Sequence, residues 1–74
     1  MNAPSATFGI YLNDQPLALP APAALLSVIE GLGLADRKGV AAAVNGEVVP
    51  RASWASRTLA EHDRVIVIRA TQGG

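Results

Sequence analysis

The chain has 74 residues, half of them apolar and 16% charged, which allows one small domain with a core and leaves no room for a second domain. Its six basic and six acidic residues cancel, which argues against a nucleic-acid binder and gives no polybasic anchor for a membrane. It has no cysteine and a single histidine, His62, so disulfides and a structural zinc site of the Cys/His type are excluded. With no visible signal peptide and no apolar run long enough to span a membrane, we expect a cytoplasmic protein.

The first predicted elements are two strands joined by a turn. Residues 1–6 are mostly small or polar, and we expect them to be a disordered lead-in. Apolar side chains alternate over residues 7–12 and again at Leu17 and Leu19, as in half-buried strands. Between these runs stand Asn13-Asp14-Gln15, which are turn-forming residues, so the sequence predicts a β-hairpin.

A helix is predicted after the prolines that end the second strand. Its apolar stripe, at positions i, i+3, i+4 and i+7, consists of Leu25, Val28, Ile29 and Leu32. Gly33 is typical of the residue just past a helix end, where a left-handed conformation is needed. The charged segment that follows is expected to be an exposed loop.

A second hairpin is predicted from residue 40 onward. Residues 40–44 form a short apolar run, typical of a strand buried on both sides. Asn45-Gly46 is the strongest short hairpin signal, because both residues accept a positive φ. The returning strand, 47–49, is stopped by Pro50, and residues 51–56 are expected to form a short turn or a single helical turn.

One more strand completes the predicted fold. The apolar run 65–68 is typical of a central strand, and residues 70–74 are expected to be a flexible tail. A hairpin, a helix and then three strands predict an α+β fold, with a mixed sheet of about five strands and one main helix on one face. This is the β-grasp, or ubiquitin-like, arrangement, which we expect to form a single domain over residues 1–74.

No constellation of catalytic residues is visible. His62 lies between two acidic residues in a predicted turn, which is typical of a solvated side chain. The serines lack the setting of a nucleophile elbow, and no glycine-rich loop opens a helix to hold a nucleotide. We therefore expect a protein without an active site of its own, with no metal site and no bound cofactor.

The unusual feature is the ending Gly73-Gly74. Two residues without side chains make the thinnest possible chain, able to thread a narrow enzyme channel and present a carboxylate. Five residues from Ala70 extend about 17 Å. Adenylation by ATP would give this carboxylate a good leaving group, and a sulfur nucleophile could then displace AMP. Because the chain has no cysteine to carry a persulfide, the terminal carboxyl group is its plausible sulfur carrier. The alternative is a tail without function.

Several of these residues resemble a known family. They are Asn13-Asp14-Gln15, the stretch Val44-Asn45-Gly46-Glu47-Val48-Val49-Pro50-Arg51 followed by Trp54, and the final Gly73-Gly74. Together they resemble the sulfur carrier protein of thiamine biosynthesis, the ThiS family. The resemblance covers about residues 10–74. The sequence departs from the family at Gln72, where many relatives have a small apolar residue, and in a longer extension before Thr7.

The resemblance implies a β-grasp fold, a function and a set of partners. An E1-like adenylyltransferase would use ATP to adenylate Gly74, which would then become a thiocarboxylate with sulfur derived indirectly from a cysteine desulfurase. Gly73 would supply the slim approach to the partner's site. Thiazole synthase would take the sulfur to build the thiazole phosphate of thiamine. The protein would be a co-substrate without an active site, and we expect the chain alone to be monomeric.

A docking surface for these partners is predicted on the last strand. Side chains alternate across a sheet, and by comparison with ubiquitin-like domains we expect Val65 and Val67 inside, with Ile66 and Ile68 outside. An exposed isoleucine pair beside the tail would be a natural docking patch; alternatively, loops of the chain cover it. Arg51 could pair with acidic residues of a partner or be solvated. Trp54 could be an interface anchor or, as we favour, part of the core.

Three other functions remain open from the sequence. The small subunit of molybdopterin synthase shares the fold and the tail chemistry, although residues 70–72 lack the approach to the glycines that is usual there. A ubiquitin-like modifier acting in tRNA thiolation or protein tagging is a second possibility. The third belongs to a different class, a β-grasp interaction module whose tail does nothing.

Overall fold

The computed structural model describes residues 7–70 of the chain. The expected lead-in, residues 1–6, and residues 71–74 of the expected tail, which include Gly73 and Gly74, lie outside this range. Ala70, the first residue of the expected tail, lies inside it, and its N–H donates to the Gly39 carbonyl. Within it there are five strands, one α-helix and one short 3-10 helix. In chain order they are β1 (Thr7–Leu12), β2 (Gln15–Pro20), α1 (Leu25–Gly31), β3 (Val40–Val44), β4 (Glu47–Val49), η1 (Arg51–Ser53) and β5 (Arg64–Arg69).

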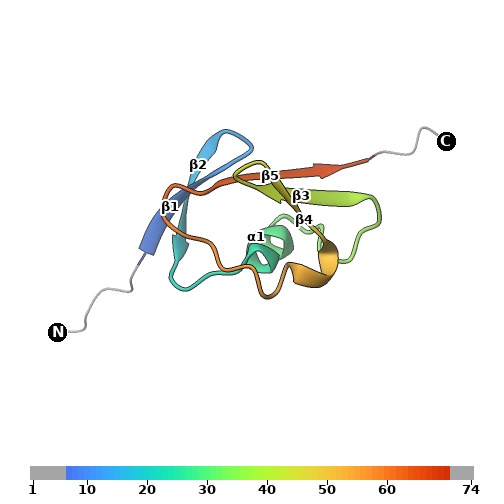
Figure 1. Ribbon diagram of the computed structural model, residues 1–74, viewed down its shortest axis with the longest axis horizontal. Helices are drawn as coiled ribbons and strands as arrows, with labels where there is room; N and C mark the ends of the chain where they lie inside the picture. Colours follow the sequence, from blue (N-terminus) through green and yellow to red (C-terminus); the bar gives the residue numbers. More distant parts are fainter. Residues whose placement is uncertain (1–6, 71–74) are drawn as a thin grey trace.

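The strands form one mixed sheet in the order β2-β1-β5-β3-β4. The pair of β1 and β5 is parallel, and the other neighbouring strands are antiparallel. Strand β5 therefore lies at the centre, as its apolar run predicts. Helix α1 covers one face of the sheet (Figure 1). The predicted mixed sheet with one helix is confirmed.

Both hairpins close through two-residue turns. Asn13 and Asp14 have φ angles of 51° and 68°, and Asn45 and Gly46 have 52° and 84°. A positive φ at both central positions matches the right-handed twist of the flanking strands. The first turn is one residue shorter than predicted, because Gln15 already pairs with Leu12 as the first residue of β2.

The outer edge of β2 carries prolines. Gly9 and Tyr11 direct their N–H groups away from β2, to the Glu61 carboxylate and the Asp63 carbonyl. Since antiparallel pairs alternate between bonded and non-bonded, the residues opposite Thr7, Gly9 and Tyr11 direct their own backbone groups to the outer edge. These residues are Pro20, Ala18 and Pro16. Among the three, Ala18 alone has an N–H group to donate.

Helix α1 ends in a glycine turn, as predicted. The Gly33 N–H donates to the Glu30 carbonyl and the Leu34 N–H to the Ile29 carbonyl, and Gly33 has a φ of 76°. This pattern is a Schellman motif. At seven residues α1 is far too short to cross a bilayer, and none of the helices in residues 7–70 has the length and hydropathy to do so.

The predicted burial of Leu32 is wrong. Leu25, Val28 and Ile29 of the stripe are buried, whereas Leu32 is the helix C-cap and is 43% exposed. The Schellman motif turns the chain back before a further helical turn can form. As a result, Leu34 packs against the core in place of Leu32.

The core lies between α1 and one face of the sheet. Its largest fully buried side chains are Trp54, Ile10, Leu25, Ile29, Val44 and Val65. Trp54 is therefore a core residue, as favoured from the sequence, and its indole N–H donates to the Val49 carbonyl at 2.9 Å.

The prediction that the strand over residues 40–44 is buried on both sides is wrong. Ala42 and Val44 are buried, but Ala41 is exposed. The helix covers one face of the sheet only. Ala41 and Ala43 lie on the other face, so they are apolar but not covered by the helix. The sheet therefore has an open face made partly of carbon side chains.

Candidate functional site

The central strand β5 presents different side chains to the two faces of the sheet. Val65 and Val67 are 0% and 5% exposed, whereas Ile66 and Ile68 are 40% and 59% exposed. The predicted orientation of these four side chains is confirmed. Within the described residues, the loops of the chain leave both isoleucines accessible.

The exposed isoleucines belong to a larger apolar area on the open face. Strand β3 lies beside β5, with Ala43 opposite Ile66 and Ala41 opposite Ile68. Strand β4 adds Val48, which is opposite Ala43 and 73% exposed. A shallow hollow of about 100 Å³ lies among these side chains. We call this area the apolar patch, and it consists of Ala41, Ala43, Val48, Ile66 and Ile68.

A polar margin borders the apolar patch near the two hairpin turns. The Arg64 guanidinium lies 5.9 Å from the centre of the Tyr11 ring, and these two residues face each other in the parallel ladder. Together with Asp14, Asn45, Gly46 and Ile66, they line a second hollow of about 410 Å³. The open face therefore combines a carbon surface with charged and aromatic groups at one end, which is the usual composition of a protein interface.

Two turn asparagines hold β5 from opposite sides. On the β1 side, the Asn13 side chain donates to the Val67 carbonyl at 3.1 Å and accepts from the Val67 N–H at 2.9 Å. On the β3 side, the Asn45 side chain accepts from the Arg64 N–H at 2.9 Å. The sequence indicated these asparagines only as turn formers. The signal for their second role is the residue type, because glycine serves a left-handed turn equally well but has no side-chain amide to bond with β5.

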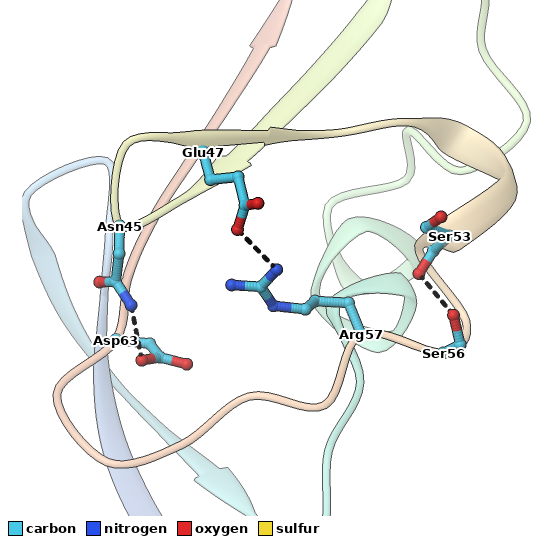
Figure 2. A network of polar contacts seen from close by, with 6 residues as sticks. All are labelled: Asn45, Glu47, Ser53, Ser56, Arg57 and Asp63. Atoms are coloured by element: carbon cyan, nitrogen blue, oxygen red, sulfur yellow. Dashed lines mark hydrogen bonds and ion pairs between the residues drawn. The ribbon is translucent and has the colours of Figure 1, made fainter.

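Side chains also anchor the loop that leads into β5 (Figure 2). Asn45 donates to the Asp63 carboxylate at 3.0 Å, and the same carboxylate accepts from the Ala60 N–H at 2.8 Å. Glu47 of β4 pairs with Arg57 at 3.1 Å. These contacts fix the start of β5 relative to the β3–β4 hairpin that carries Val48.

Arg51 is engaged within the chain. Its guanidinium donates to the carbonyls of Ala35 and Arg37 and lies 4.6 Å from the centre of the Trp54 ring. The residue itself is exposed. Its contacts in the described part of the chain are with the loop after α1 and with Trp54, and they do not include the apolar patch.

The polar residues considered as catalytic candidates are spread over turns. His62 is 77% exposed and lies 3.8 Å from the Glu61 carboxylate. Its backbone N–H donates to the Gly9 carbonyl at 2.7 Å. Within residues 7–70 no group of three or more His, Cys, Asp or Glu side chains could hold a metal ion.

Comparison with known proteins identifies the family. A sequence profile described as the ThiS family matches residues 5–74, nearly the whole chain. This chain belongs to the ThiS family. Membership supports a sulfur-carrier role for this ThiS-family protein, as the residue resemblance implied. No curated protein matches the chain.

Two solved structures are similar to this ThiS-family protein. One is the crystal structure of the thiamine biosynthesis protein ThiS from Geobacter metallireducens, with a TM-score of 0.73 and 22% identity, covering 90% of this chain and 100% of that chain. The other is an NMR solution structure of a thiamine biosynthesis protein from Geobacter metallireducens, with a TM-score of 0.72 and 22% identity, covering 90% of this chain and 88% of that chain. These likenesses confirm the predicted β-grasp fold.

Proposed function

We propose that this ThiS-family protein carries sulfur as a thiocarboxylate on Gly74 for thiazole formation in thiamine synthesis. The observation that carries the proposal is the family match, which extends through residue 74 and therefore includes the Gly73-Gly74 ending. In this role the protein is a co-substrate of two enzymes, an E1-like adenylyltransferase and thiazole synthase.

The chemistry needs only the carboxylate of Gly74 from this chain. A carboxylate oxygen attacks the α-phosphate of ATP, pyrophosphate leaves, and an acyl adenylate forms. A cysteine desulfurase forms a persulfide, and a thiol reductant, itself oxidised to a disulfide, releases its outer sulfur as sulfide. The sulfide then attacks the acyl carbon. A C–S bond forms, the C–O bond to AMP breaks, and the proton on the attacking sulfur goes to solvent. Gly73 lets the chain pass through a narrow channel to the nucleotide.

The apolar patch is the surface we propose for docking the activating enzyme. Ile66 and Ile68 are its largest side chains, and they lie on β5, the strand that leads toward Gly74 in the sequence. An area of this kind, rimmed by polar groups, is typical of interaction sites. We propose Arg51 as a second docking residue, which would contact the partner from beside the loop after α1.

Intact-mass spectrometry of the protein purified from its native host tests the proposal. A fraction of the molecules should carry one sulfur in place of one oxygen, and the exchange should map to Gly74. Deletion of Gly74 should abolish this fraction. In host cells that lack any other copy, the same deletion should stop growth without thiamine, and added thiazole should restore growth. Unchanged growth of the deletion strain would contradict the proposed function.

A further inference from the structure

The end of β5 is fixed by one contact with the loop before β3. The Ala70 N–H donates to the Gly39 carbonyl at 2.7 Å. This bond comes directly after the last pair of the β3–β5 ladder, Val40 with Arg69. Within residues 7–70 it is the final backbone hydrogen bond before the segment 71–74, which contains the proposed sulfur-carrying glycine.

A side chain at position 39 would crowd the end of this strand. Gly39 has a φ of 76°, in the left-handed region that favours glycine. A Cβ built on it would lie 3.0 Å from the Ala70 carbonyl oxygen and 3.6 Å from the Ala70 Cβ. The first distance is shorter than ordinary van der Waals contact, so Ala70 would have to give way by a few tenths of an ångström. The bare backbone of Gly39 therefore sets where Ala70 lies.

Support for β5 at this point comes from one side. On the β1 side the Asn13 side chain reaches Val67, and in the described part of the chain no later residue of β5 has a partner there. On the β3 side the contacts continue to the strand end: Val40 pairs with Arg69, and the Gly39 carbonyl accepts from the Ala70 N–H. If Gly39 is displaced, Ala70 therefore moves with it, because no contact on the β1 side in the described part of the chain holds the end of β5 in place.

We propose that Gly39 is a positioning residue that sets the direction in which the chain leaves the sheet toward Gly74. The inference rests on the proposed function. Four residues follow Ala70 in the sequence, and fully extended they span at most about 14 Å. Because this segment is short, a change of direction at Ala70 shifts the region that Gly74 can reach, and the partner's nucleotide is then reached less often even while the apolar patch stays docked.

The chain contains a matched control for this test. Gly33 has the same φ of 76°, but a Cβ there would meet nothing within 4 Å. Gly33→Asn and Gly39→Asn therefore place asparagine at the same φ and differ in the contact with Ala70. Asparagine is chosen because it tolerates the left-handed region better than other residues with side chains, which favours folding of both variants.

The experiment measures how fast the host's E1-like activating enzyme adenylates each full-length variant with ATP. Release of pyrophosphate is the measured signal. For Gly39→Asn we expect unchanged KM and unchanged affinity for the enzyme, with kcat lower by on the order of tenfold. For Gly33→Asn we expect wild-type kcat and KM. Equal kcat for the two variants would overturn the inference. If the wild-type protein itself is not adenylated, the proposed function fails instead.

Amide hydrogen exchange gives a second readout that does not depend on the enzyme. The Ala70 N–H should exchange faster in Gly39→Asn than in the wild type, because the bond to the Gly39 carbonyl is strained or lost. Gly33→Asn should leave it unchanged. If Ala70 keeps its wild-type protection in Gly39→Asn, position 39 does not control the strand end and the inference is wrong.

Discussion

The side-chain amide of Asn13 pairs with both backbone groups of Val67, at 2.9 and 3.1 Å. The backbone of Asn13 also donates to the Val65 carbonyl at 2.8 Å. Strand β1 has already turned into the hairpin at this point, so the side chain acts as one more residue of the parallel ladder. It extends the support of the central strand beyond the last residue of β1.

Replacement of Asn13 by glycine should destabilise the protein. Glycine keeps the φ of 51° without strain but removes two partly buried hydrogen bonds, each contributing roughly 0.5–1.5 kcal/mol net. We expect Asn13→Gly to lower the free energy of unfolding by about 1–3 kcal/mol, measured by urea denaturation. Asp14→Gly is the control, because Asp14 has a φ of 68° in the same turn and its side chain makes no hydrogen bond in the described residues. Equal stability of the two variants would show that the Asn13 amide contributes nothing.

Charge on the apolar patch should weaken docking of the activating enzyme. An aspartate at Ile66 or Ile68 would place a carboxylate against a desolvated partner surface. We expect Ile66→Asp and Ile68→Asp each to weaken the affinity for that enzyme at least about tenfold, measured by calorimetric titration. Leu32→Asp is the matched control, because Leu32 is 43% exposed against 40% for Ile66 but lies at the end of α1. If all three variants bind alike, the partner docks elsewhere.

Substitution of Arg51 separates its contacts within the chain from a role in docking. Arg51→Gln removes the hydrogen bonds to the carbonyls of Ala35 and Arg37 and the stacking on Trp54. We expect lower stability, seen as a lower urea midpoint, and a several-fold weaker affinity for the activating enzyme. The affinity is measured well below the unfolding transition, so that only folded protein is compared. Wild-type affinity with reduced stability would assign Arg51 to the fold alone.

The sequence predicts the elements of this fold well where local rules and tertiary packing agree. Alternation and the Asn45-Gly46 pair place the strands and the second hairpin, and Gly33 places the helix end. The apolar run at β5 predicts its central position, and the alternation within it predicts which side chains are exposed. These features depend on the periodicity of apolar residues and on the conformational preferences of single residues, and both can be recognised in the sequence alone.

The features that the sequence does not reveal depend on contacts between distant residues. Leu32 fits the helical stripe, but the Schellman motif ends the helix, so that Leu34 packs against the core and Leu32 does not. The alanines of β3 are apolar on both faces, although the helix covers one face only. The pairing of Asn13 with Val67 and the contact of Gly39 with Ala70 join residues far apart along the chain. Amino-acid type alone could not show these partners.

The prolines on β2 have a consequence for a protein whose apolar patch is exposed. The edge strand of a sheet can pair with a strand of a neighbouring molecule, and this pairing needs a row of free backbone N–H and C=O groups. With Pro16 and Pro20 flanking Ala18, the outer margin of β2 cannot sustain that row. Strand-by-strand growth of an aggregate along the β2 edge is therefore disfavoured, even though the apolar patch on the open face stays exposed.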